Sequence, residues 1–254
     1  MRRVARAAAR LPSEEFRREI ATALLEYDPS VVLEAVGAKQ NREPRLERMP
    51  LDLEPDGRLE FEDLAGLFAS SVLNHGIVGM TIRQVAYIFG WTRRTGVRRA
   101  IEIGRWRGGT TVALAAAMGS EGTVWSIDVG EKAMRVLGAD PGELDREIRE
   151  FCERFDLRVE LLVGDSRTIE VETGPVDLVV IDGDHGYEGV RSDFERFGRR
   201  VRRGGSVILD DAFDDLFVPS HPESVGRLVG EIVSRGDFRL EHAVDRLAHL
   251  VRLR

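Results

Sequence analysis

The chain has 254 residues, a net charge of −7 and a pI near 5.4, which allow one large α/β domain with an accessory segment and disfavour a nucleic-acid or anionic-membrane surface. Cys152 is the only cysteine, so an intrachain disulfide and a cysteine-based zinc site are excluded. No run of about 18 apolar residues and no signal-peptide core occurs, and we therefore expect a cytoplasmic protein without a membrane partner.

The amino-terminal part, residues 1–97, is predicted to form a mostly helical cap. Helical patterns occur at residues 13–25, 61–73 and 81–90, and the stretch between the first two is polar and contains proline. We expect this cap to contribute contacts to the acceptor substrate. The candidate residues are His75, Met80, Trp91 and, from the main domain, Phe213.

Residues 98–254 alternate apolar runs with helical patterns, which is typical of parallel strands joined by right-handed crossovers. Strands are predicted at residues 99–103, 123–128, 159–163, 177–182 and 206–210, and helices at 109–118, 141–155, 187–201 and 224–234. Two short runs, 238–244 and 249–253, lie close enough to form an antiparallel hairpin. The fold class is therefore α/β, with a doubly wound, Rossmann-like sheet of seven mostly parallel strands.

An acid-Gly-x-x-x-Gly turn, Glu102 to Gly108, joins the first predicted strand to an alanine-rich helix. Gly104 and Gly108 can adopt backbone angles that other residues avoid, and they let a ligand approach the main chain. A dinucleotide is disfavoured, because the tighter Gly-x-Gly-x-x-Gly turn that faces pyrophosphate is absent. The turn predicts the floor of a nucleotide-type cofactor site, with Glu102 as an acceptor for a cation or for hydroxyls.

All five predicted parallel strands finish with acids at or beside one edge of the sheet, where ligands of open α/β sheets bind. A cluster of carboxylates repels itself unless cations or hydroxyl-rich ligands occupy it. Asp128 is placed to accept both hydroxyls of a ribose, and Asp165 with Ser166 suits the edge of an adenine. Each of these acids could also be an ordinary helix cap or turn residue.

A second group of acids, Asp182, Asp210 and Asp211, ends two neighbouring strands and predicts a divalent cation site. Oxygen ligands favour Mg²⁺, Mn²⁺ or Ca²⁺ over zinc. Asp184 and His185 follow directly, where a general base could take a proton from a substrate hydroxyl. His185 could instead orient the loop.

Three segments resemble the class I S-adenosylmethionine-dependent methyltransferases, and more narrowly their macrocin-type sugar O-methyltransferase branch: residues 102–109, 181–190 and 204–211. The resemblance covers about residues 98–254. It implies S-adenosylmethionine as cofactor, a metal held by the three aspartates, and Asp184 as base. Catechol methyltransferases place a lysine where this chain has His185, so their lysine base is excluded. The predicted coenzyme-binding residues are Glu102, Gly104, Arg105, Trp106, Gly108, Thr110, Asp128, Asp165, Ser166 and Asp182.

The leading hypothesis is a divalent-metal-dependent O-methyltransferase that acts on a hydroxyl of a small molecule, such as a sugar in natural product biosynthesis. No nucleic-acid partner is expected, and a homo-oligomer, dimer or larger, stays open. One alternative is a metal-independent methyltransferase with His185 or Asp184 as base. Two others are a non-catalytic S-adenosylmethionine-binding protein and, least favoured, a nicotinamide-dependent oxidoreductase.

Overall fold

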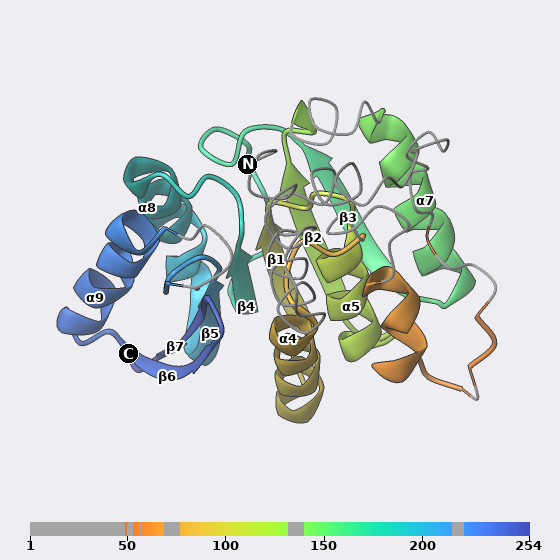
Figure 1. Ribbon diagram of the computed structural model, residues 1–254, viewed down its shortest axis with the longest axis horizontal. Coiled ribbons are helices and arrows are strands. Elements are labelled where there is room, and N and C mark those ends of the chain that lie inside the picture. Colours follow the sequence, from red (N-terminus) through yellow and green to blue (C-terminus); the bar gives the residue numbers. More distant parts are fainter. Residues whose placement is uncertain (1–48, 50–52, 56, 69–76, 132–139, 215–220) are drawn as a thin grey trace, which may run out of the picture.

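A single sheet of seven strands lies at the centre of the computed structural model, in the order β3-β2-β1-β4-β5-β7-β6 (Figure 1). The structure describes residues 49, 53–55, 57–68, 77–131, 140–214 and 221–254. Strands β1 to β5 are parallel, and β7 runs antiparallel between β5 and β6. The strands are β1 (Arg99–Ile103), β2 (Thr123–Asp128), β3 (Arg158–Val163), β4 (Val176–Ile181), β5 (Val201–Leu209), β6 (Phe238–Val244) and β7 (Leu247–Arg252). The predicted fold class is confirmed.

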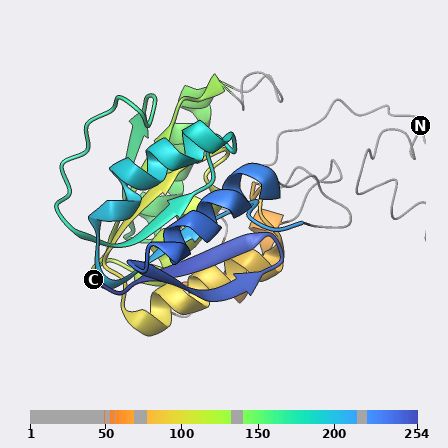
Figure 2. The same cartoon turned by 90° about the vertical axis from the view of Figure 1, so that its left-hand side faces the viewer.

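Helices cover both faces of the sheet (Figures 1 and 2). One face packs against α4 (Ile82–Thr95), α5 (Gly109–Met118) and α7 (Pro141–Arg154), and the other against α8 (Tyr187–Arg196) and α9 (Arg227–Ser234). Every residue of α5 is buried, because this helix lies between the sheet and α4. A helix that is apolar all round is expected to be covered on all sides.

The start of β5 differs from the prediction. The helix predicted at 187–201 ends at Arg196, is followed by a short 3₁₀ turn, η2 (Gly198–Arg200), and β5 begins at Val201 instead of residue 206. Exposed Arg202, Arg203 and Gly204 resemble a turn in the sequence, although they continue the strand. A register shift against β4 and the positive φ of Gly204 accommodate this irregular stretch.

The described part of the predicted cap packs into the same core as the sheet. Helix α4 starts with a capping box, in which Thr81 and Gln84 exchange side-chain to backbone hydrogen bonds, and ends at left-handed Gly96. Its buried face contributes Val85 and Ile88 to the core around α5. The domain boundary between residues 97 and 98 stays a prediction.

Other predictions for the amino-terminal part are covered incompletely. Of the helix predicted at 61–73, the structure describes a 3₁₀ helix, η1 (Glu62–Phe68), and the remainder lies outside the described residues, as does the helix predicted at 13–25. The helix predicted at 81–90 is present and continues to Thr95. In the part of the chain that the structure describes, no helix has the length and hydropathy needed to cross a bilayer.

Candidate functional site

A cavity of about 1330 Å³ opens at the carboxyl ends of β1, β2, β4 and β5. This is the edge at which open α/β sheets bind their ligands. Six of the aspartates predicted from the sequence line it together, although the strands that carry them are far apart in the chain. They are Asp128, Asp165, Asp182, Asp184, Asp210 and Asp211.

The glycine turn forms one wall of this cavity because two strand ends pass very close to each other there. Gly104 has a φ of +88°, and a Cβ at this position would lie 1.9 Å from the carbonyl oxygen of Asp182. A Cβ on Gly108, whose φ is +83°, would lie 2.3 Å from Ile148 of α7. Gly104 therefore lines the cavity and Gly108 packs behind it, and neither position accepts a side chain without a shift of its neighbours.

Asp128 lines the cavity and is held by three backbone amides. Its Oδ2 accepts from the N–H groups of Arg105 (2.7 Å) and Trp106 (3.0 Å), and its Oδ1 accepts from Gly130 (2.6 Å). A carboxylate offers about four lone-pair positions, so acceptor capacity for a ligand is left. The hydrogen bonds fix the carboxylate beside the glycine turn.

Glu102 lies behind the wall of the cavity, in contrast to the acceptor role predicted for it. The side chain is fully buried, and its Oε2 accepts from Ser126 (2.5 Å) and from Thr111. Burial raises the pKa of Glu102 to about 7, although both hydroxyl groups and Arg105 act in the opposite direction. Its Oε1 has no hydrogen-bond partner among the described residues.

Arg105, Gly108 and Thr110 also lie outside the lining of the cavity, although direct coenzyme contacts were predicted for them. The Arg105 guanidinium is buried, pairs with Asp145 of α7 at 3.0 Å and donates to the carbonyl oxygen of Ser126 at 2.7 Å. It therefore ties the glycine turn to β2 and α7. Among the described residues, its only hydrogen bond to the cavity lining runs from its backbone N–H to Asp128.

Asp165 and Ser166 lie on the cavity wall after β3. Hydrogen bonds from the side chain and backbone of Arg167 lower the pKa of Asp165 to about 2. Ser166 is hydrogen-bonded to Asp193 of α8, a buried residue that the sequence analysis missed. Burial raises the pKa of Asp193 to about 6, which the hydrogen bond from Ser166 partly opposes.

His185 lies between two of the predicted metal ligands. Its Nε2 is 3.2 Å from Oδ1 of Asp182, and its Nδ1 is 2.9 Å from Oδ2 of Asp211. Burial alone would lower the pKa of His185, but the two hydrogen-bonded carboxylates outweigh it and raise the pKa to about 10. The ring is thus an imidazolium at neutral pH, with both nitrogens donating, and it differs from the neutral base that the sequence suggested.

Asp184 keeps the position expected of a base. It lies in the cavity lining, and its Oδ1 accepts from the backbone N–H of Gly186 at 2.9 Å. A carboxylate with this single local hydrogen bond can accept a proton at its other oxygen.

Two residues that the sequence analysis missed complete the acid cluster. Arg246, at the turn between β6 and β7, donates through Nη1 to Oδ1 of Asp211, and its Nη2 is 3.9 Å from Oδ2 of Asp210. Gln84 of α4 donates to Oδ1 of Asp210 at 2.6 Å. Burial, followed by the charges of Asp182 and Asp211, raises the pKa of Asp210 to about 7.

No sequence motif indicates Arg246 or Gln84, but the strand pairing of the fold predicts the position of Arg246. Because β7 is antiparallel to β5 and Leu209 pairs with Ala248, the turn before β7 must lie beside the end of β5. The capping box places Gln84 at the start of α4, but nothing local indicates which side chain it meets.

The predicted oxygen-only cation site fits this arrangement poorly. Among the described residues, the ligand atoms that gather within 4.8 Å of one another belong to His185, Asp211 and His221, whereas Asp182 and Asp210 lie outside this group. His221 was not predicted. The carboxylates of Asp210 and Asp211 are instead compensated by Arg246, and both Asp182 and Asp211 are compensated by His185.

The acceptor contacts predicted for the cap are not at the cavity. Met80 is buried in the core around α5, Trp91 packs edge-on against His249 with 4.5 Å between ring centroids, and Phe213 packs on the other core. Gly79 and Val78 line the cavity in their place. His75 lies outside the described residues.

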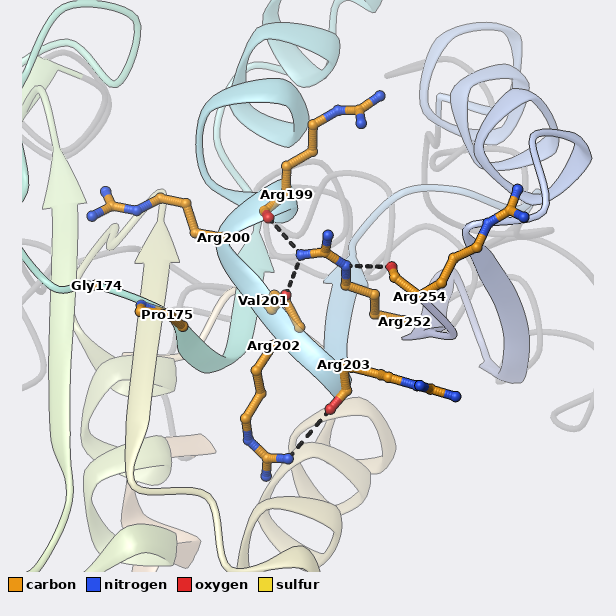
Figure 3. A pocket seen from close by; sticks show the side chains of 9 residues that line it. All are labelled: Gly174, Pro175, Arg199, Arg200, Val201, Arg202, Arg203, Arg252 and Arg254. Atoms are coloured by element: carbon orange, nitrogen blue, oxygen red, sulfur yellow. Dashed lines mark hydrogen bonds between the residues drawn. The ribbon is translucent and has the colours of Figure 1, made fainter.

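A second cavity, of about 410 Å³, lies at the amino ends of β4 and β5 and is lined by six arginines (Figure 3). Figure 3 shows their guanidinium groups pointing away from one another. Arg252, at the centre, donates to the carbonyl oxygens of Arg199 (2.7 Å) and Val201 (2.5 Å). This arrangement joins strand ends and does not converge on one ligand.

Comparisons with known proteins agree with the fold. Residues 101–212 match a family model described as a methyltransferase domain. A caffeoyl-CoA O-methyltransferase candidate from Staphylococcus aureus has a similar fold, with a TM-score of 0.52 and 16% identity over 66% of this chain and 82% of that chain. An O-methyltransferase from Bacillus cereus, in complex with S-adenosylhomocysteine, gives a TM-score of 0.51 and 21% identity over 68% and 82%.

A curated relative matches over a shorter segment. The uncharacterized protein R132 of Acanthamoeba polyphaga mimivirus is 35% identical over 57 residues, which are 22% of this chain. The match spans only 26% of that relative's length.

Proposed function

We propose that this chain is a class I S-adenosylmethionine-dependent methyltransferase and that it transfers the methyl group to a hydroxyl oxygen of a small molecule. The observation that carries the proposal is one cavity that joins the glycine turn to the acids at the ends of β4 and β5. A coenzyme at the turn and an acceptor at the acids would lie next to each other. Proximity of this kind is a large part of the rate enhancement in group transfer.

On the coenzyme side, the residues fit a nucleoside with a cationic sulfur. Gly104 leaves the backbone open, Asp128 keeps acceptor capacity for hydroxyls, and Asp165 lies across the cavity on the β3 side. When bound, S-adenosylmethionine supplies an electrophilic methyl group on its sulfonium. The surrounding carboxylates favour this positive charge.

On the acceptor side, Asp184 is the residue that takes the proton. The substrate oxygen attacks the methyl carbon, the carbon–sulfur bond breaks, the hydroxyl proton passes to Asp184, and the thioether leaves as S-adenosylhomocysteine. His185 and Arg246 provide fixed positive charge beside the oxygen as it loses its proton. Asp184 also lies on the β4–α8 loop, directly after Asp182 and Gly183, which reach the glycine turn.

A divalent cation was expected at the three aspartates, and the donor set argues against this part of the hypothesis. Each carboxylate of Asp182, Asp210 and Asp211 already faces a protein donor. We therefore assign no step of the reaction to a metal. The substrate class that follows is a hydroxylated small molecule, with a sugar of a glycosylated natural product as one class to screen.

The test combines binding and turnover. Calorimetry should show S-adenosylhomocysteine binding to the wild type, and a coupled assay for S-adenosylhomocysteine release should identify acceptors in a panel of hydroxylated compounds. With an acceptor in hand, Asp184→Asn should abolish turnover and leave coenzyme affinity intact. An inability to bind the coenzyme would refute the proposal, and release of product from thiols or amines alone would refute the oxygen acceptor.

A further inference from the structure

The acid cluster at the end of β5 concentrates negative charge in a buried place. Asp210 and Asp211 are consecutive and only 4% and 5% exposed, and Asp182, which follows the neighbouring strand β4, lines the same cavity. Buried carboxylates that are not neutralised repel each other strongly and destabilise the fold. The cluster therefore requires compensating positive charge.

Arg246 provides that charge from a rigid position. The residue is 7% exposed, and its carbonyl oxygen accepts from the N–H of Ala212 at 2.8 Å. The neighbouring Asp245, whose φ is +51°, accepts from Thr81 at 2.8 Å and pairs with Arg83 at 3.1 Å. These contacts fasten the β6–β7 turn to the start of α4 and hold the guanidinium over Asp211.

The same contacts place donor groups of the protein against the oxygens that a cation would use. On Asp211, Oδ1 accepts from Arg246 and Oδ2 from His185, while Oδ1 of Asp210 accepts from Gln84. A cation bound by His185, Asp211 and His221 would need a deprotonated His185 and would lie beside the positive charge of Arg246. The carboxylates are thus already compensated by protein groups that carry positive charge or donate hydrogen bonds.

We propose that Arg246 supplies, as a fixed guanidinium, the positive charge that metal-dependent relatives would obtain from a divalent cation, so that this acceptor centre works without a metal. This inference rests on the proposed methyl transfer. One consequence concerns the substrate: an acceptor needs no second oxygen for chelation, so compounds with an isolated hydroxyl become substrates.

The test is a titration of Mn²⁺, followed by calorimetry and by electron paramagnetic resonance of the free ion, into metal-stripped protein saturated with S-adenosylhomocysteine. The wild type should bind no Mn²⁺ stoichiometrically. Arg246→Ala should gain stoichiometric binding, because it removes the guanidinium charge beside Asp210 and Asp211, whereas Arg246→Lys should not. Arg239→Ala is the matched control, since it removes an exposed arginine of β6 that pairs with Glu241 on the same strand.

The results separate this inference from the proposed function. Stoichiometric Mn²⁺ binding to the wild type that is lost in Asp211→Asn would overturn the role of Arg246 and leave methyl transfer standing. A folded Arg246→Ala that gains no binding would also overturn it. Should Arg246→Ala not fold, the wild type and Asp211→Asn decide alone. Failure to bind S-adenosylhomocysteine, in contrast, contradicts the proposed function itself.

Discussion

The two edges of the sheet carry opposite charges, and buried charged side chains lie at the carboxyl edge, whereas those at the amino edge are mostly exposed to solvent. At the carboxyl edge, Asp210 and Asp211 are buried, and Asp211 is fixed by Arg246 and His185. At the amino edge, six arginines surround a small cavity, and three of them pair with Glu195, Asp177 and Asp237 on the surface. The guanidinium of Arg203 makes no ion pair with any described residue.

The difference shows that burial decides whether a charged side chain is fixed well enough to take part in a reaction. Exposed ion pairs adjust to solvent and contribute little to stability, whereas a buried charge fixes its partner and changes its protonation. The side chain of Arg254 is 71% exposed, against 8% for Arg246. The carboxyl edge therefore has the preorganised charges that a reaction centre needs, and the amino edge does not.

The largest expected effect is the loss of stability on removal of Arg246, the buried arginine of the carboxyl edge. Arg246→Ala should lower the free energy of unfolding by about 3–5 kcal/mol, because it removes the buried guanidinium that pairs with the buried carboxylate of Asp211. Chemical denaturation of the variant and the wild type measures the difference. A loss no greater than that of Arg254→Ala would mean that the two edges do not differ in the way described.

A pH dependence should distinguish the edges next. The pKa of Glu102 is raised from 4.5 to about 7 in the folded protein, so the native state binds this proton more tightly than the unfolded state does. Its contribution to stability is therefore full below about pH 4.5 and is lost as the pH rises toward 7, by roughly 3 kcal/mol.

Glu102→Gln should flatten this part of the profile of unfolding free energy against pH. The control is Glu195→Gln at the amino edge, where the pKa is lowered and the same window should be unaffected. Identical profiles for the wild type and Glu102→Gln would contradict the buried-acid interpretation. Asp210 titrates in the same range, so a residual slope is expected.

A third experiment tests whether coenzyme and acceptor bind in separate parts of the cavity at the carboxyl edge. Asp128→Ala should weaken S-adenosylhomocysteine binding by about 1–3 kcal/mol through the loss of a charged acceptor. Asp184→Asn, which removes the proposed base, should leave this affinity nearly intact and abolish turnover. Calorimetry on both variants measures the split, and equal losses of affinity would show that coenzyme and acceptor do not occupy separate parts of the cavity.

The smallest effect belongs to the amino edge. Arg203→Gln should change the free energy of unfolding by no more than about 0.5 kcal/mol, which is usual for a surface position without a fixed partner. Coenzyme affinity should not change, since the six residues 204–209 of β5 separate Arg203 from the acids at the far end of the strand. A larger change in either quantity would indicate that the arginines act as a site.

Local pattern was enough for most of the fold. The strands at 99–103, 123–128 and 238–244 and the helix at 109–118 occur as predicted, because apolar periodicity and glycine turns are encoded within each segment. The beginning of β5 was not predictable in this way. Its exposed arginines and Gly204 have the composition of a turn, and only pairing with β4 shows that they belong to a strand.

The candidate site was likewise predictable from the sequence only in part. The acids at the strand ends follow from the sequence, since parallel strands must bring their carboxyl ends to one edge. Their partners do not follow, because Gln84 and Asp210 are 126 positions apart and Arg246 and Asp211 are 35 apart. By itself the sequence determined the sheet, the glycine turn and the edge where ligands bind. Only the tertiary structure decided how each acid is compensated, because desolvation and pairing of charge depend on contacts between segments that no local pattern relates.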